Sequence, residues 1–254
     1  MGKAVLGLGY CVAVASGKGG TGKTSVCAGI ATALALEGKR VLCVDCDVGL
    51  RNLDISLGLA DTAPLSFQEI IAGSHSLDAL LPHPQFPSLY FLTAPVNRTA
   101  DQIDEEGFFA MVAKARDRFD YVFLDAPAGV ETGLRLTATR ADMVMVVTGS
   151  DPASMRDAAR TGQLLELMGK EQVKLVVNRI DPRMVSRMAL TVDDVMDNTA
   201  LPLLGIVPDD PDVVFAAAFG RPLLSHTKKG AAAACKRIAS RLQGMPVPIP
   251  MKKL

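Results

Sequence analysis

The sequence predicts an α/β fold, a mostly parallel, doubly wound sheet of about seven to eight strands flanked by helices. Three observations support this prediction. Short apolar runs alternate with helical segments along the 254 residues, an order typical of parallel sheets. A glycine-rich loop lies between the first apolar run and the first helical segment. Apolar residues make up 49% of the chain but aromatic residues only 5%, which suits a sheet core of Val, Ile, Leu and Ala.

The strands are predicted from short runs rich in Val, Ile or Leu that end at polar or turn residues. They are 10–15, 40–45, 89–94, 121–125, 142–148, 173–179 and, including a turn, 203–210. The helices are predicted at 25–37, 66–72, 107–119, 153–168 and 231–242. The first is rich in Ala and Leu, lacks Pro and stops before Gly38, a natural C-cap. The last places Ala231, Cys235 and Ile238 on one stripe, which predicts that it docks on the sheet.

The glycine-rich loop matches the phosphate-binding pattern G-x-x-x-x-G-K-[ST] from Gly17 to Thr24. Its position between a strand and a helix is the context that this pattern requires, so the fold is predicted to be that of a P-loop NTPase. Lys23 would neutralise the β- and γ-phosphates, and the Thr24 hydroxyl would be a Mg²⁺ ligand. The residues predicted to contact ATP or ADP here are Gly17, Lys18, Gly19, Gly20, Thr21, Gly22, Lys23, Thr24 and Ser25.

A second lysine, Lys18, follows the first glycine of the motif. The stretch resembles the deviant Walker A motif, K-G-G-x-G-K-T, of the MinD/ParA/nitrogenase-iron-protein class of ATPases. That resemblance implies that ATP is bound between two subunits and that Lys18 reaches the nucleotide of the partner subunit. Lys18 and Lys23 are accordingly the two predicted catalytic lysines.

The segment after the second strand, Asp45-Cys46-Asp47-Val48-Gly49-Leu50-Arg51-Asn52-Leu53-Asp54, carries several polar residues. Carboxylates at this end of a parallel strand lie beside the P-loop, where they can hold Mg²⁺ or orient a water. The segment resembles switch I of the MinD family, D-x-D-x-G-L-R-N-L-D. By that resemblance Asp47 is the catalytic aspartate, Asn52 contacts nucleotide at the dimer face, and Asp45 and Asp47 lie near the metal.

The run 121–125 closes on Asp125, and Asp125-Ala126-Pro127-Ala128-Gly129 follows the pattern D-x-P-A-G. This resembles the Walker B strand and switch II of the MinD family, which implies that Asp125 lies near the metal and that Gly129 senses the γ-phosphate. The same resemblance assigns the base contacts to Asn178, Arg179, Pro208 and Asp209. It covers nearly the whole chain, about residues 12–242.

Charge is unevenly distributed. Residues 221–254 contain eight Lys or Arg and no Asp or Glu, whereas the whole chain has 27 of each sign. An anionic membrane surface could attract such a basic end, and an equally valid interpretation is a solvated last helix. We predict one ATPase domain over 1–244 and a Pro-rich basic tail over 245–254, where alternating prolines exclude a helix. The tail is either a truncated membrane anchor or no anchor at all.

The five cysteines show no framework typical of a secreted protein, and no apolar run is long enough to span a bilayer. Cys43 and Cys46 match C-x-x-C but lie at the end of an apolar strand, so we interpret all five as reduced core residues. No signal peptide is visible. The expected location is the cytoplasm, with ATP-dependent peripheral association with the inner face of the cell membrane.

The resemblance implies a slow, partner-stimulated ATPase that forms a homodimer with ATP and controls membrane association and division-site placement. Its partners would be a division inhibitor and an ATPase activator of the MinC/MinE type. Two alternatives share the mechanism: a flagellar placement ATPase of the FlhG type and a DNA segregation ATPase of the ParA type. The acidic body argues against nucleic-acid binding, which needs a basic stripe. An iron–sulfur protein of the same class would need paired cysteines at the dimer face.

Overall fold

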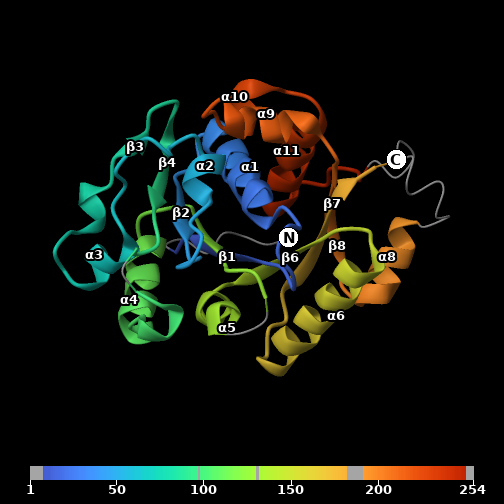
Figure 1. The fold of residues 1–254 in the computed structure, drawn as a ribbon, viewed down its shortest axis with the longest axis horizontal. Coiled ribbons are helices and arrows are strands. Elements are labelled where there is room, and N and C mark those ends of the chain that lie inside the picture. Colours follow the sequence, from blue (N-terminus) through green and yellow to red (C-terminus); the bar gives the residue numbers. More distant parts are fainter. Residues whose placement is uncertain (1–7, 97, 130–131, 182–190, 250–254) are drawn as a thin grey trace.

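The computed structural model describes residues 8–96, 98–129, 132–181 and 191–249 (Figure 1). Its strands form one eight-stranded sheet in the order β3-β4-β2-β5-β1-β6-β7-β8, parallel except for the β3–β4 pair. The strands are β1 (Tyr10–Ala15), β2 (Val41–Asp45), β3 (Pro82–His83), β4 (Phe86–Leu92), β5 (Tyr121–Asp125), β6 (Met143–Thr148), β7 (Val173–Ile180) and β8 (Leu203–Pro208). This architecture confirms the predicted fold class.

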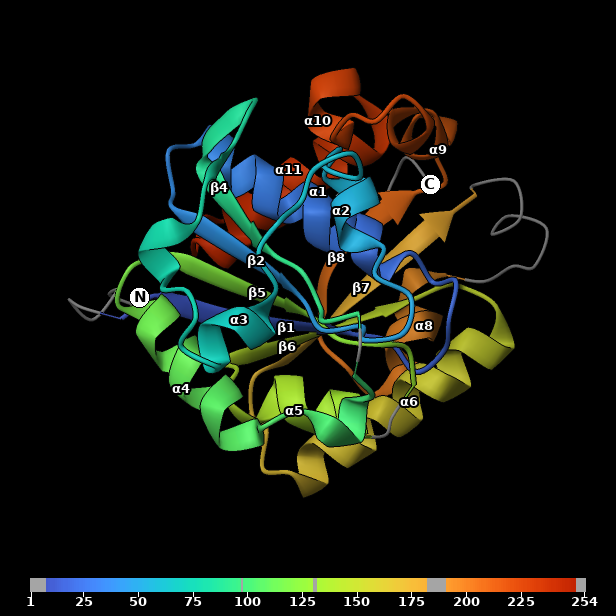
Figure 2. The same cartoon turned by 60° about the vertical axis from the view of Figure 1, so that its left-hand side comes forward.

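Helices cover both faces of the sheet (Figures 1 and 2). One face carries α1 (Lys23–Leu36), α2 (Leu53–Ser56), α9 (Pro211–Ala218), α10 (Leu223–His226) and α11 (Gly230–Leu242). The other carries α3 (Phe67–Ile71), α4 (Glu105–Arg116), α5 (Thr132–Thr139), α6 (Pro152–Leu167) and α8 (Val192–Thr199). Two short 3₁₀ turns lie at Leu77–Ala79 and Ala100–Gln102. Each face buries its own apolar cluster, so the central strands are apolar on both sides.

Strand β1 shows how this core is built. Val12 and Val14 point into the cluster beneath α1, whereas Ala13 and Ala15 point into the opposite cluster. All four side chains are fully buried. Because β1 lies at the centre of a parallel sheet, the loop that follows it opens at the edge where ligands bind in doubly wound folds.

The main differences from the sequence predictions are at helix starts and in missed short elements. Helix α1 begins at Lys23 rather than at residue 25, because the last residues of the phosphate loop already form its first turn. Helices α8 and α9 were not predicted. Both carry clear start signals, a capping box of Thr191 with Asp194 and the pair Asp210-Pro211. Each is only eight residues long, too short for apolar periodicity to identify a helix, and the same holds for α5, which was also not predicted.

The first residues of the Pro-rich tail lie on the domain. Arg241 donates hydrogen bonds to the carbonyl oxygens of Val247 (2.8 Å), Pro248 (2.7 Å) and, on edge strand β8, Leu204 (3.0 Å). Ile249 packs against the core cluster of the opposite face. The tail therefore covers the β8 edge as far as residue 249 without adding a strand.

Candidate nucleotide site

The phosphate loop connects β1 to α1 at the carboxyl edge of the sheet. Two of its glycines occur where a side chain has no room. A Cβ at Gly17 would lie 2.4 Å from the backbone oxygen of Asp157 on α6, and one at Gly22 would lie 2.3 Å from Nδ2 of Asn178. Gly20 and Gly22 also have φ values of 82° and 81°, which disfavour other residues. The loop is thus held tightly against β7 and α6.

The N-terminus of α1 lacks a cap from the protein. Its N-cap residue, Gly22, makes no side-chain cap bond, and the first turn contains no acidic residue. Thr21, just before it, has a buried hydroxyl oxygen without a hydrogen-bond partner. Free backbone N–H groups and the helix dipole make such an end an anion site. The predicted phosphate-contacting residues converge here, with Lys18, Gly19 and Gly20 exposed and Thr24 and Ser25 half-buried.

Lys23 forms a buried ion pair with Asp125 at the end of β5. The Nζ–Oδ1 distance is 2.8 Å, and the two side chains are 7% and 1% exposed. Burial raises the pKa of Asp125, while the charge and hydrogen bond of Lys23 oppose this rise. Lys23 Nζ also lies 3.4 Å from the Thr24 hydroxyl. The structure therefore brings together the predicted lysine, hydroxyl and Walker B carboxylate.

Asp45 anchors the start of switch I. It lies beside Asp125, its register partner in the neighbouring strand. It accepts hydrogen bonds from the backbone N–H groups of Asp47 (2.9 Å) and Leu53 (3.1 Å). Burial, followed by the charge of Asp125, raises the pKa of Asp45 from 3.8 to about 6. The Asp45 carboxylate thus links switch I to the sheet, although its negative charge is disfavoured by burial and by the neighbouring Asp125.

The raised pKa of Asp45 predicts a pH effect on stability. The folded protein holds this proton more tightly than the unfolded chain does, so the free energy of unfolding falls as pH rises from about 4 to about 6. A rise from 3.8 to about 6 corresponds to about 3 kcal/mol. We expect the Asp45→Asn variant to gain about 3 kcal/mol relative to the native protein between pH 4 and pH 7. Urea unfolding at several pH values tests this, and parallel profiles for the two proteins would contradict it.

The rest of switch I is folded back on itself. Oδ1 of Asp47 lies 3.2 Å from the backbone nitrogens of both Gly49 and Leu50, which donate to it. Asn52 is exposed and makes no cap bond at the start of α2. Arg51 has a φ of 49° and donates from Nε to the Thr93 hydroxyl. A non-glycine residue in this conformation is typical of strained functional loops.

The donor set fits a magnesium ion. Two carboxylates, Asp45 and Asp125, end neighbouring parallel strands, and the Thr24 hydroxyl lies 3.4 Å from the Lys23 Nζ that pairs with Asp125. Asp47 is close enough to Asp125 to influence its pKa. Oxygen ligands of this kind, together with phosphate oxygens, are those that Mg²⁺ prefers.

In switch II, Gly129 has a φ of 99°, and its N–H donates to the Ser16 carbonyl at 3.1 Å, which links that loop to the phosphate loop.

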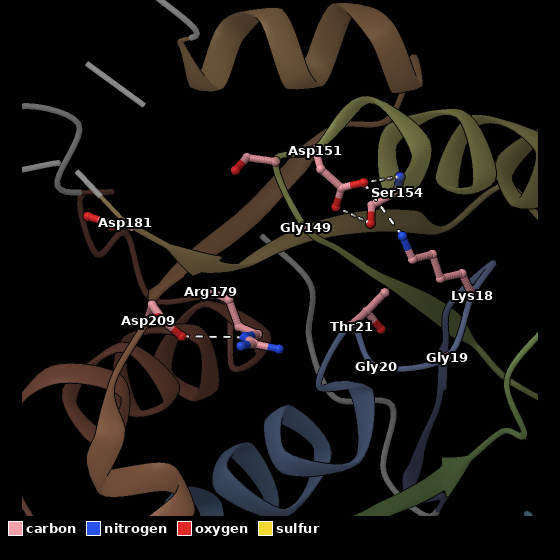
Figure 3. A pocket seen from close by; sticks show the side chains of 11 residues that line it. Lys18, Gly19, Gly20, Thr21, Gly149, Asp151, Ser154, Arg179, Asp181 and Asp209 are labelled. Carbon is pink, nitrogen blue, oxygen red and sulfur yellow. Dashed lines mark hydrogen bonds and ion pairs between the residues drawn. The ribbon is translucent and has the colours of Figure 1, made fainter. Parts of the chain in front are cut away.

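Lys18 leaves the phosphate loop toward α6. Its Nζ lies 3.5 Å from Oδ1 of Asp151, and the two side chains are 42% and 54% exposed. Asp151 also caps α6 by accepting from Ser154, and these bonds, assisted by Lys18, lower its pKa. Figure 3 shows Lys18 and Asp151 on one side of an open cavity of about 440 Å³, with Arg179 and Asp209 on the other. Neither Asp151 nor Ser154 was assigned from the sequence, although Asp151-Pro152 is a helix-start signal.

The residues predicted to contact the base surround a second cavity of about 220 Å³. Asn178 is buried there, and its Nδ2 donates to the Thr21 carbonyl at 2.7 Å. Arg179, with a φ of 57°, pairs with Asp209 at 3.3 Å, and both line the two cavities. The sequence did not identify the apolar part of this lining, because such residues look like ordinary core positions. It consists of Val26, Val207, Val213, Val214, Leu223, Ala231 and Cys235.

Comparison with known proteins agrees with this geometry. Residues 12–223 match the family model of the CobQ/CobB/MinD/ParA nucleotide-binding domain. The chain is 38% identical to the septum site-determining protein MinD of Synechocystis, over 93% of this chain and 90% of that protein. The chain belongs to the MinD family. The resemblance found in the motifs is thereby confirmed.

Solved structures of MinD proteins are also similar. The match to a MinC:MinD cell division protein complex from Aquifex aeolicus has a TM-score of 0.87 and 37% identity, and covers 94% of this chain and 98% of that chain. MinD from Pyrococcus horikoshii complexed with Mg-ADP matches with a TM-score of 0.81 and 26% identity, over 92% and 96% of the chains. This chain is accordingly a MinD-type ATPase whose ligands are ATP or ADP and Mg²⁺.

The cysteines lie away from any exposed face. All five are free and buried, and burial raises the pKa of Cys11 and Cys235 to about 12. A thiol with so high a pKa is a poor nucleophile and a poor metal ligand at neutral pH. Their surroundings are therefore those of packing residues.

Proposed function

We propose that this chain is an ATP-driven dimerising switch that controls membrane association and division-site placement. ATP pairs two copies, the pair associates with the anionic inner face of the cell membrane, and hydrolysis releases it. The proposal rests on the environment of Lys18, a cation on the phosphate loop. Its Nζ lies 3.5 Å from Oδ1 of Asp151, and the side chain is partly exposed. Its own subunit holds it only weakly, because exposed ion pairs contribute little. It is therefore available to reach a nucleotide on a second copy.

In this proposal the side chains divide the work of hydrolysis. Lys23 leaves Asp125 to bind the β- and γ-phosphates, while the N–H groups of the α1 N-terminus hold the remaining phosphate oxygens. Asp47 orients the attacking water, and Lys18 of the second copy stabilises charge that develops in the transition state. Thr24, with Asp45, Asp47 and Asp125 nearby, would hold Mg²⁺, which would neutralise phosphate charge. Gly129 couples the γ-phosphate to switch II.

Asn178 is proposed to select adenine. Its Nδ2 donates one hydrogen to the Thr21 carbonyl, which fixes the orientation of the amide and leaves its oxygen as the acceptor for a base. An acceptor suits the exocyclic amine of adenine and opposes the carbonyl oxygen of guanine. Arg179, Pro208 and Asp209 form the nearby rim, and Asn52 contacts nucleotide across the dimer face.

The partners proposed are a second copy, a MinC-type division inhibitor and a MinE-type activator of a slow ATPase. The similarity to MinD in the Aquifex complex with MinC supports the inhibitor. The net positive charge of residues 221–254 supports contact with anionic lipid. In the described part of the chain, no helix is both long and apolar enough to cross a bilayer. Residues 1–244 would act as the switch and 245–254 as its tail.

Co-sedimentation with vesicles of phosphatidylglycerol and phosphatidylethanolamine tests the membrane step. We expect pelleting with Mg-ATP and little with Mg-ADP, and the Lys18→Ala variant should stay in the supernatant with either nucleotide. ATP-dependent dimers that do not pellet would retain the switch and show that its anchor is missing or supplied by a partner. Absence of both dimers and pelleting would refute the proposed function.

A further inference from the structure

One carboxylate, that of Asp210, lies at the start of two helices. Both helices border the base cavity, which is the cavity of about 220 Å³ lined by Asn178. Asp210 lies in the turn between β8 and α9. Its Oδ1 accepts from the backbone N–H of Asp212 at 3.0 Å, in the first turn of α9. Its Oδ2 accepts from the backbone N–H of Ala231 at 2.8 Å, in the first turn of α11. Asp210 therefore caps two helix N-termini that are about twenty residues apart in the chain.

The start of α11 is shaped around this carboxylate. Its own N-cap residue, Lys229, makes no side-chain cap bond. Gly230 has a φ of 49°, and a Cβ added there would lie 2.0 Å from Oδ2 of Asp210. Only glycine fits this close approach, so α11 depends on a cap supplied by a distant residue.

The two capped helices form a wall of the base cavity. Val213 and Val214 of α9 and Ala231 and Cys235 of α11 line it, and so does Asp210 itself. Asn178 lines the same cavity, so a change in the spacing of the two helices would change the shape of this base-binding slot. Among the described residues, Asp210 is the one side chain that is hydrogen-bonded to the starts of both helices, so loss of the cap would remove the hydrogen bonds that join them.

The cap also determines which helix N-terminus remains open to an anion. The N-termini of α1, α9 and α11 all lie around this part of the site, and each helix N-terminus attracts anions. Asp210 satisfies those of α9 and α11, whereas α1 has no capping side chain and no acid in its first turn. The phosphates are thus directed to α1, and an uncharged base is left for the other side.

We propose that Asp210 is a positioning residue that holds the α9 and α11 walls together and makes the site bind nucleoside triphosphates in preference to free polyphosphate. The proposal relies on nucleotide binding at the phosphate loop and is independent of the dimer and membrane steps. Arg179 and Asp209, predicted from the sequence, border the slot, whereas Asp210 determines its shape.

Calorimetric titration of the Asp210→Ala protein with Mg-ATP and with Mg-tripolyphosphate tests this. We expect the dissociation constant for ATP to rise about tenfold or more and that for tripolyphosphate to change less than twofold. Asp210→Asn keeps one acceptor oxygen and should fall between the native protein and the alanine variant. Asp104→Ala is the matched control, because Asp104 caps α4 on the opposite face through Gly107. It should leave both affinities unchanged.

The Gly230→Ala variant provides a second route to the same perturbation, since its methyl group would displace the Asp210 carboxylate from α11. It should reproduce the selective loss of ATP affinity, with folding checked by circular dichroism. If Asp210→Ala does not fold, Gly230→Ala and Asp210→Asn decide the question. The proposal fails if the folded variants bind ATP as the native protein does. It also fails if ATP and tripolyphosphate weaken in parallel, because the phosphate loop would then be affected and not the slot.

Discussion

Replacing Lys23 by methionine is expected to weaken ATP binding by about 100-fold and to lower the free energy of unfolding by about 3 kcal/mol. Both effects follow from the buried pair with Asp125. The substitution removes the cation that binds phosphate and leaves a carboxylate that is 1% exposed without its counter-charge. Calorimetric titration with Mg-ATP and urea unfolding measure the two quantities separately. The loss of stability should be larger at pH 8 than at pH 5, because an unpaired buried carboxyl favours its neutral form.

The double variant Lys23→Met/Asp125→Asn separates these two effects. Removing the unpaired charge of Asp125 should restore most of the free energy of unfolding, because a neutral pair has no uncompensated carboxylate. ATP binding should stay as weak as in Lys23→Met, since the phosphate-binding cation is still absent. If the double variant were as unstable as the single one, the ion pair would not be the cause of the destabilisation.

Lys18→Ala is expected to abolish ATP-dependent dimers and to reduce ATP hydrolysis by about 1,000-fold or more, the order of effect seen for cations supplied in trans to phosphoryl transfer. ATP binding to the single subunit should change little, because Lys18 faces Asp151 and not the α1 N-terminus. Light scattering with Mg-ATP and phosphate release measure the two effects. Stability should fall by less than about 1 kcal/mol, because the pair is exposed.

Asp151→Asn is the matched variant. Asparagine is as good an N-cap as aspartate, so the start of α6 is preserved while the ion pair with Lys18 is lost. Dimers should still form, because only the resting contact of Lys18 has been removed. Normal ATP-dependent dimers in Lys18→Ala would refute the trans role of this lysine, and loss of dimers in Asp151→Asn would show that the contact itself is needed.

The switch I segment shows how far motif reasoning extends. Its residues were identified from their order along the chain, and Asp45 and Asp125 do lie side by side at the ends of β2 and β5. The hydrogen bonds that fold Asp47 back onto Gly49 and Leu50 were not predicted. Such bonds depend on loop geometry, which a pattern of residue types does not specify.

The base cavity shows where sequence reasoning stops. Asn178 and Asp209 were assigned by resemblance, but Val213, Ala231 and Cys235 come from helices separated in sequence and look like core residues. Asp210 was not assigned at all. Its second partner, Ala231, is brought to it only by the docking of α11 against β8 and α1, a contact between distant segments that no local pattern indicates.

The sequence by itself determined the α/β class, the phosphate loop, the two switches and the family, because each depends on local order: apolar runs, glycines at fixed spacing and carboxylates at strand ends. The tertiary structure alone decided which charges meet. It paired Lys23 with Asp125 and Lys18 with Asp151, and it placed Asp210 between two helix starts. The physical reason is that burial and hydrogen bonding between remote residues arise only when the packed sheet brings distant parts of the chain together.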